Sequence, residues 1–273
     1  MNGHWKLEDI HWDAFDASKV KPELLQAVKA ASMVEYNARD YVTYLSNVFA
    51  DDPVILRDIN QWGIEEEQHG RALGAWAEIA DPNFNFEEAF ARFRAGYGLP
   101  LGMMESVRGS RAGELLARCV VESGTSSFYS AIKDASDEPL LKEITAHIAA
   151  DELRHYKLFY NNLGRYSAEL PTIMSRLRVA IDRFSEASDD ELSFAYYCGN
   201  FDPAKESYKR GRCYRSYSRR AFGFYQRHHT DRLISLIANA VGFHPKNPFV
   251  KALSGFVFLS FRLRSHFLRL AAV

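Results

Sequence analysis

The amino-acid sequence predicts an all-helical protein whose core is a four-helix bundle. Apolar residues recur at spacings of three and four along most of the 273 residues, while the alternating pattern of β-strands is scarce. Four of the helical segments are about 25 residues long, which corresponds to about 37 Å at a rise of about 1.5 Å per residue. They form two pairs, with a short turn inside each pair and a longer crossover between the pairs, and this is a bundle topology.

Proline, glycine and acidic residues mark the ends of the four long helices. Pro22 suits the first turn of the first helix, which is predicted as one continuous segment to about Phe49. The segments "ADDP", "ADP", "SDEP" and "NNLG" end the four helices in turn. A shorter helix near 86–95 and the loop "GYGLPLGM" at 96–103 form the crossover. The four predicted ranges are 22–49, 53–80, 107–135 and 139–163.

The chain after Gly164 is predicted to add helices that pack on this bundle. The predicted ranges are 168–187, 189–198, 205–222, 228–241 and 247–270. We expect a single domain over residues 1–273, with a core at about 20–165 and accessory helices at about 166–273.

The amino-acid composition and the net charge argue against several classes of protein. Apolar residues make up 47% and charged residues 25%, with a net charge of −1, so bulk charge gives no argument for nucleic-acid binding. Cys119, Cys198 and Cys213 are scattered, so neither a disulfide framework nor a zinc motif is expected, and a reducing cytoplasm fits. The N-terminus lacks a signal-peptide pattern. No window of about 18 uncharged apolar residues predicts a membrane span.

Two Glu-x-x-His motifs provide the first candidate functional residues. Glu66 and His69 lie in the second long helix, and Glu152 and His155 lie in the fourth. Residues three apart share one helical face, so each pair can aim a carboxylate and an imidazole at one point. A chain of this length contains about half a match to such a motif by chance, so the other two long helices decide its meaning.

Each of those two helices supplies one carboxylate in apolar or small surroundings, Glu35 in the first and Glu122 in the third. A buried ionised carboxylate is costly unless it is paired or bound to a metal. Glu35 precedes Glu66 by 31 residues. Glu122 precedes Glu152 by 30 residues. In antiparallel neighbours both spacings return the chain to about the same level, so all four carboxylates and both imidazoles can meet inside the bundle.

Four carboxylates with two imidazoles form a hard, oxygen-rich ligand set. This set suits a pair of Fe or Mn ions and not structural zinc. It matches the known pattern of one Glu from each of two bundle helices and a Glu-x-x-His from each of the other two. Glu65 and Glu67 point about 100° to either side of Glu66 and are not expected to be ligands. The alternative is that the buried Glu and His side chains pair among themselves without a metal.

With these residues, the chain resembles the soluble di-iron carboxylate proteins of the ferritin-like superfamily, and within them the acyl-carrier-protein desaturases. Trp62 in "WGIEEEQHG" is similar to the family's Trp-x-x-x-Glu-x-x-His-Gly, and Asp151 in "ADELRHY" to its Asp-Glu-x-x-His. Thr125 follows Glu122 by three residues, as in the family. The resemblance covers about residues 20–165, although the chain is shorter than plant desaturases and its loops are tighter.

The resemblance implies roles for three further residues. Thr125 would take part in oxygen activation, Asp151 would accept the outer N–H of a ligand histidine and fix its tautomer, and Trp62 would be an electron-entry residue. Core packing is the alternative for Trp62. A hydroxyl bonded to its own helix is the alternative for Thr125. Substrate-binding residues are not identified.

The sequence thus predicts an O₂-dependent di-iron oxidoreductase that desaturates or hydroxylates an apolar, acyl-type substrate. Its cofactors would be two Fe ions, with Fe/Mn or Mn as alternatives, and O₂ would be the co-substrate. Two other classes stay open. One is a ferritin- or rubrerythrin-like protein that binds iron or removes peroxide, and the other is a di-iron hydroxylase of tRNA or of an amine.

The sequence also suggests partners. No flavin or nicotinamide motif is present, so an external, ferredoxin-like electron donor is expected. Residues 205–227 hold eight basic residues and one acid, which predicts a docking face for acyl carrier protein or a CoA thioester, or else a solvated helix face. The apolar tail at 249–273 is expected to pack on the bundle or to form a homodimer interface, in preference to lying on a membrane surface.

Overall fold

The computed structural model describes residues 4–186 and 190–270, and every regular element in these ranges is a helix. The predicted all-α class is therefore confirmed. The α-helices are α1 (Pro22–Tyr36), α2 (Ala38–Val48), α3 (Pro53–Ala80), α4 (Phe86–Gly96), α5 (Arg111–Ala135), α6 (Pro139–Arg165), α7 (Ile173–Glu186), α8 (Asp190–Asn200), α9 (Arg210–Phe224), α10 (Arg227–Val241) and α11 (Pro248–Leu270). Short 3-10 turns are Leu7–Asp9, Trp12–Ala14, Ala17–Lys19 and Ser167–Glu169.

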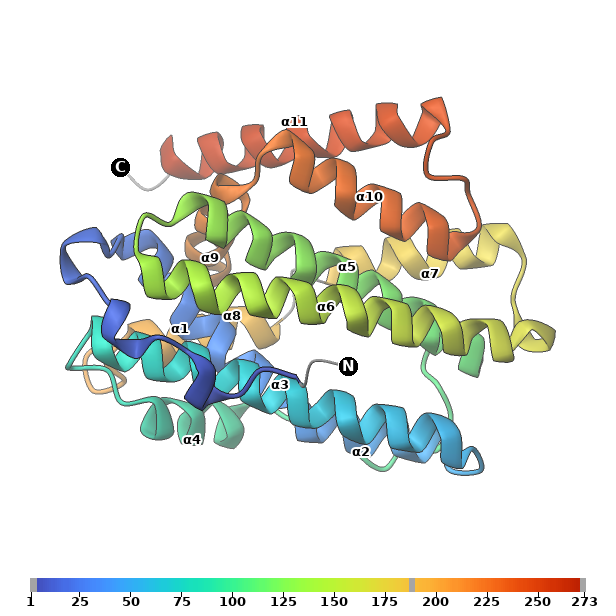
Figure 1. Ribbon diagram of the computed structural model, residues 1–273, viewed down its shortest axis with the longest axis horizontal. Helices are drawn as coiled ribbons and strands as arrows, with labels where there is room; N and C mark the ends of the chain where they lie inside the picture. The colour runs from blue at the N-terminus through green and yellow to red at the C-terminus, as the bar shows by residue number, and fades with distance from the viewer. Residues whose placement is uncertain (1–3, 187–189, 271–273) are drawn as a thin grey trace.

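Two helix pairs lie at the centre of the molecule (Figure 1). α1 and α2 together run along α3, and α5 runs along α6. α3 also contacts α6, which brings the two pairs together. The short turns within each pair are those predicted from the sequence, and α4 lies on the crossover between the pairs.

Side-chain caps set where the long helices begin. Asp52 accepts hydrogen bonds from first-turn N–H groups of α3, and Pro53 occupies the first turn. Ser110 caps α5 in the same way. The predicted start of this helix at residue 107 is wrong because Gly109, with a φ of +82°, interrupts the helical backbone.

The first predicted helix is not continuous. α1 ends at Tyr36 and α2 begins at Ala38, with Asn37 at φ −80° and ψ 8° between them. Arg94 Nη1 of α4 donates to Asn37 Oδ1 at 2.8 Å, and Arg94 also pairs with Asp40. These contacts from α4 hold the break in place. The apolar periodicity does not reveal it because the pattern continues through both helices.

A glycine in α3 lets α1 come close beside this break. A Cβ atom on Gly70 would lie 2.5 Å from the backbone N of Tyr36, closer than side chains tolerate. Gly70 directly follows His69, and Tyr36 directly follows Glu35. The absence of a side chain at this position therefore allows the two helices to carry Glu35 and His69 within reach of each other.

Two apolar clusters fill the space between the long helices and leave a polar layer between them. On α3, Glu66 is buried between Trp62, which belongs to one cluster, and Leu73, which belongs to the other. On α6, Glu152 occupies the same kind of position. The polar layer is therefore enclosed by apolar side chains on both sides along the helices.

The remaining helices pack on this centre. α7 and α10 contact α5, α8 contacts α1, and α9 contacts both α8 and α11. α11 lies outermost, over α9 and α10 (Figure 1). The helix predicted at 168–187 begins later, at Ile173, and residues 187 and 189 lie outside the described chain. Among the described helices, none combines the length and the apolar character that crossing a membrane requires.

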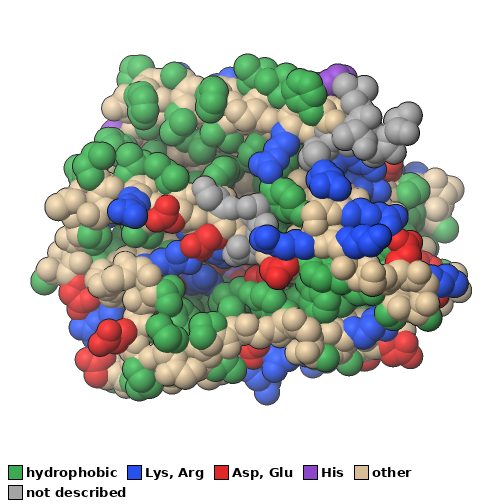
Figure 2. All heavy atoms as spheres, turned by 180° about the vertical axis from the view of Figure 1, so that it is seen from behind, with side chains coloured by type: hydrophobic (Ala, Val, Ile, Leu, Met, Phe, Trp, Pro, Cys, Tyr) green, Lys and Arg blue, Asp and Glu red, His purple; other side chains and the backbone are tan. Residues whose placement is uncertain are grey.

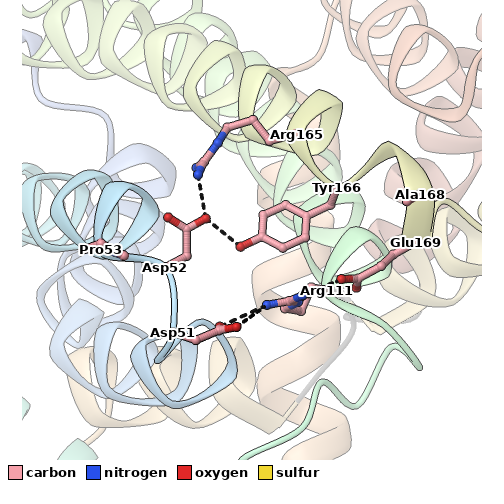
Figure 3. A pocket seen from close by; sticks show the side chains of 8 residues that line it. All are labelled: Asp51, Asp52, Pro53, Arg111, Arg165, Tyr166, Ala168 and Glu169. Carbon is pink, nitrogen blue, oxygen red and sulfur yellow. Dashed lines mark hydrogen bonds and ion pairs between the residues drawn. The ribbon is translucent and has the colours of Figure 1, made fainter.

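A cleft of about 350 Å³ opens where the α2–α3 turn meets the start of α5 and the end of α6 (Figure 3). Charged side chains from these helix ends pair across it. The pairs are Asp52 with Arg165 and Tyr166, and Arg111 with Asp51 and Glu169. Because these charges neutralise one another, the cleft is better described as a clamp between helix ends than as a ligand site.

Glu138 offers a test of how the helices are joined. Its buried carboxylate caps α6 and accepts hydrogen bonds from Trp76 Nε1 at 2.8 Å and from Asp16 N at 3.1 Å. Glu138→Ala leaves these donors unpaired, so we expect a loss of about 2–4 kcal/mol in the free energy of unfolding, measured with urea. The control is Glu87→Ala, an exposed first-turn residue of α4, for which we expect less than about 0.5 kcal/mol. Equal losses in both variants would contradict the assigned role.

Candidate metal centre

Six buried side chains from four helices meet in the polar layer, and none is more than 7% exposed. Their potential ligand atoms form two overlapping sets, and the atoms of each set lie within 4.8 Å of one another. One set is Glu35, Glu66, His69 and Glu152, and the other is Glu66, Glu122, Glu152 and His155. Glu66 and Glu152 belong to both sets, so the structure brings together all six side chains that the sequence singled out as ligands.

An acidic side chain orients each of the two histidines from outside the cluster. His69 Nε2 lies 3.0 Å from Asp151 Oδ2. His155 Nε2 lies 2.8 Å from Glu65 Oε2. Because a carboxylate accepts the hydrogen bond, Nε2 carries the proton and Nδ1 faces the cluster. The arrangement is crossed, since each acid sits on the helix opposite to the histidine that it orients.

Five buried nitrogen and oxygen atoms of the cluster have no hydrogen-bond partner among the described residues. They are Glu66 Oε1, His69 Nδ1, Glu122 Oε1, Glu152 Oε1 and His155 Nδ1. His155 Nδ1 does lie 2.9 Å from Glu66 Oε1, but without hydrogen-bond geometry. Unpaired buried polar atoms are rare and costly. Cations placed among these atoms would satisfy them, so the residues present fit a metal pair.

The pKa values of three of the carboxyl groups are shifted in the direction expected for like charges that are clustered in a dry interior. Burial, followed by repulsion from neighbouring carboxylates, raises the pKa of Glu35, Glu66 and Glu122 above the ordinary value. Glu152 behaves differently. Burial alone would raise its pKa, but the two imidazoles close beside it outweigh that effect and lower it.

The pKa values of the two imidazoles shift in the opposite direction from those of isolated buried histidines. Burial lowers an imidazole pKa, but the hydrogen bond with Asp151 and the nearby carboxylate of Glu152 outweigh it and raise the pKa of His69 to about 9. In the same way, the nearby carboxylate of Glu152 and the hydrogen bond with Glu65 raise the pKa of His155 to about 10. At neutral pH the cluster therefore holds protons that a bound cation would displace.

Thr125 of α5 faces the same cluster. Its hydroxyl lies 2.7 Å from Glu152 Oε2 and 3.2 Å from the backbone O of Val121 on its own helix. The carboxylate is the nearer and more strongly charged acceptor, so the hydroxyl proton is directed to the cluster. Its role in oxygen activation stays a prediction.

Trp62 belongs to one of the two apolar clusters. Its ring packs edge-on against Phe159 at a centroid distance of 5.6 Å, and its N–H has no partner among the described residues. Trp5 is the tryptophan beside the cluster. Its Nε1 donates to Asp151 Oδ2 at 2.7 Å, and its ring stacks on His69 at 6.0 Å. Trp5 lies far from the motifs in sequence, so only the folded chain reveals this contact.

Two other residues at the cluster were not among the predicted site residues. Glu65 orients His155, and an acid does stand directly before the Glu of each Glu-x-x-His, as the sequence shows. Tyr129 donates its hydroxyl to Glu35 Oε1 in a short hydrogen bond. Its position, two turns after the cluster residue on α5, is also an ordinary position for a core aromatic, so the spacing alone does not single it out.

A second group of possible ligands lies where α5 ends and α10 begins. His228 Nε2 and His229 Nε2 each lie 3.1 Å from Asp134 Oδ2. However, His229 Nδ1 accepts the backbone N–H of Gln226, so its Nε2 carries the proton and donates to Asp134. This geometry describes a hydrogen bond that joins two helices and not a metal site.

Neither the family models nor the curated proteins that were compared with this chain match it. Any functional conclusion therefore depends on the chemistry of the site itself. The buried carboxylates and imidazoles form groups that could hold a metal ion.

Proton release on metal binding tests the electrostatics of the cluster. The pKa values of about 9 for His69 and about 10 for His155 place a displaceable proton on each imidazole at pH 7, and the buried carboxyls add more. We expect more than about two protons released per metal pair, and an affinity for Mn²⁺ that rises between pH 6 and pH 8 because fewer protons then compete. Calorimetric titrations in two buffers of different ionisation enthalpy measure both quantities. Tight binding without proton release would contradict this description.

Proposed function

We propose that the chain is a di-iron carboxylate protein, with a ferritin-like four-helix bundle formed by α1–α2, α3, α5 and α6. The observation that carries the proposal is the sharing of two carboxylates, Glu66 and Glu152, between two four-membered sets of ligand atoms. One metal ion would be held by Glu35 and His69, and the other by Glu122 and His155. Glu66 and Glu152 would be available to both ions.

The chemistry of the donor set supports iron or manganese. Four carboxylates and two imidazole nitrogens provide mostly hard oxygen ligands, whereas structural zinc favours tetrahedral sets rich in Cys and His. The three cysteines are buried and none belongs to a described ligand group. Iron is the metal we propose, because O₂ chemistry then becomes available.

We propose that the activity is O₂-dependent oxidation of an apolar substrate of the acyl type, by desaturation or hydroxylation. A reduced iron pair supplies electrons to O₂ when it is bound. The protein excludes water from the layer, orients both imidazoles through Asp151 and Glu65, and keeps a hydroxyl proton of Thr125 directed at the inner carboxylate. Desaturation then removes two hydrogens from the substrate and, with two electrons and two protons, reduces O₂ to two waters.

The outer edge of the site supports oxidation in preference to iron storage. Storage needs a wet, acidic path along which cations can pass. Here the acids outside the histidines are already engaged, because Arg154 Nη2 donates to Asp151 at 2.5 Å and to Glu65 at 3.3 Å. A guanidinium at this position opposes the passage of cations on that side.

An external electron donor is part of this proposal. The hydrogen-bonded series Trp5, Asp151 and His69 connects the N-terminal segment with the cluster, and it offers the donor a route inward. We therefore propose Trp5 for electron entry, in addition to Trp62, which the sequence predicts for that role.

Metal content tests the ligand assignment. Glu122→Ala and His155→Ala each remove one terminal ligand, so we expect fewer than two metal ions per chain after anaerobic loading, measured by mass spectrometry of the metal content. Glu67→Ala is the matched control, because Glu67 lies beside Glu66 but pairs with Arg39 on the outside. Two ions retained in either ligand variant, with the helical circular dichroism unchanged, would exclude this assignment.

Reaction with O₂ tests the activity. The iron-loaded protein, reduced chemically and mixed with O₂ and a series of acyl thioesters, should consume O₂ and yield a product that has lost two hydrogens or gained one oxygen. Trp5→Phe keeps the aromatic ring but loses the N–H to Asp151, so reduction by a protein donor should slow while metal content stays at two ions. Formation of an iron mineral without any product would favour storage and overturn the proposal.

A further inference from the structure

The outermost helix, α11, carries large apolar side chains on a buried face and on a separate exposed face. Val250 and Phe261 are buried against the rest of the molecule, as are Ser254 and Ser265. On the other side, six large apolar side chains follow one another at spacings of three and four. This α11 stripe consists of Phe249, Leu253, Phe256, Leu259, Leu263 and Phe267, which are 38–68% exposed. A helix that is apolar on both sides is expected to be covered on both sides.

The α11 stripe is larger than the scattered exposed apolar residues of an ordinary surface. Phe249 and Phe256 are each 68% exposed. With free aromatic side chains offering about 200 Å² each, the six residues together present on the order of 600 Å² of apolar area. Patches of this size mark binding surfaces for proteins or lipids.

Basic side chains flank the stripe, and acids are missing from the two helices of this face. Lys251, Arg262 and Arg264 are exposed on α11. Arg264 is anchored, since it bonds to the hydroxyl of Tyr214 on α9 and lies over that ring. The sequences of α9 and α11 contain no Asp or Glu. Figure 2 shows the hydrophobic side chains along α11 and a concentration of Lys and Arg below its C-terminal half, over α9.

The basic residues at the N-terminal cap and in the first turns of α9 divide into two kinds. Arg210 pairs with Asp190 and Arg212 with Glu206, so these two are partly neutralised. Lys209 and Arg215 are exposed and form no ion pair with a described residue. Free positive charge therefore remains beside the apolar stripe.

The charge distribution distinguishes between two candidate occupants of this face, a second copy of the chain and an anionic lipid surface. A second copy of the chain, paired through α11, would bring Lys251, Arg262 and Arg264 of both copies together without any acid from α9 or α11 to balance them. The apolar area is also below the roughly 800 Å² per partner that a standard protein interface buries. An anionic lipid surface meets both requirements, because it offers acyl chains to the stripe and phosphates to the flanking cations.

We propose that the face formed by α11 and α9 docks on an anionic bilayer surface, with the α11 stripe inserted among the lipids and the basic side chains at the headgroups. The contact is interfacial and places α11 parallel to the bilayer plane. This inference stands on the surface alone and does not depend on the metal centre. It also differs from docking of an acidic protein to residues 205–227, which would leave the stripe uncovered.

Flotation of the full chain with vesicles tests the proposal. We expect binding to phosphatidylcholine vesicles that contain one third phosphatidylglycerol, weak binding to phosphatidylcholine alone, and release as salt is raised. The double variant Phe249→Ser, Phe256→Ser should bind about tenfold or more weakly, because both changed side chains are exposed members of the stripe. Lys251→Glu with Arg262→Glu should lose the preference for anionic vesicles.

The matched control is Met103→Ser with Met104→Ser, which removes two exposed apolar side chains from the loop before α5 and should leave binding unchanged. Circular dichroism and metal content check that every variant is folded. Absence of binding by the unaltered chain, or equal binding by the stripe variant, would overturn the proposal. Sedimentation velocity gives the remaining outcome. A dimer that the stripe variant dissolves, without vesicle binding, would identify a second copy as the occupant and would equally overturn it.

Discussion

The structure depends on the cost of burying four carboxylates and two imidazoles in one layer between apolar clusters. An unpaired buried charge costs several kcal/mol, of the same order as the roughly 5–15 kcal/mol that stabilises a folded domain. Raised carboxyl and imidazole pKa values show how the chain meets that cost with protons. Some carboxylate oxygens and imidazole nitrogens of the layer still lack a hydrogen bond, so bound protons do not satisfy every buried polar atom.

Several local features of the fold follow from this constraint. Gly70 removes a side chain where α1 and α3 must approach, and Asn37 interrupts α1 just after Glu35, held by Arg94 of α4. Outside the layer, Asp151 and Glu65 fix the two imidazoles with their Nδ1 atoms inward. Together these features bring the six polar side chains into one layer and fix the orientation of both imidazoles.

The outer surface has a distinctive feature of its own. The chain buries its charges at the centre and exposes a continuous apolar stripe on α11. If the two proposals both hold, a protein that oxidises apolar chains would rest on the surface in which such chains are stored. The two sites lie on different helices, and each can be removed by substitution without touching the other.

The sequence by itself determined the all-α class, the long helices and the six clustered side chains, because helical periodicity and spacings of three residues are local properties that the chain carries without reference to its neighbours. It placed Glu35 and Glu122 at the level of their partners because antiparallel helices joined by short turns preserve residue counts. Only the tertiary structure decided the break at Asn37, the contact of Trp5 with Asp151, and the exposure of the α11 stripe. These depend on contacts between residues far apart in the chain, and periodicity cannot say which of two apolar helix faces a neighbour will cover.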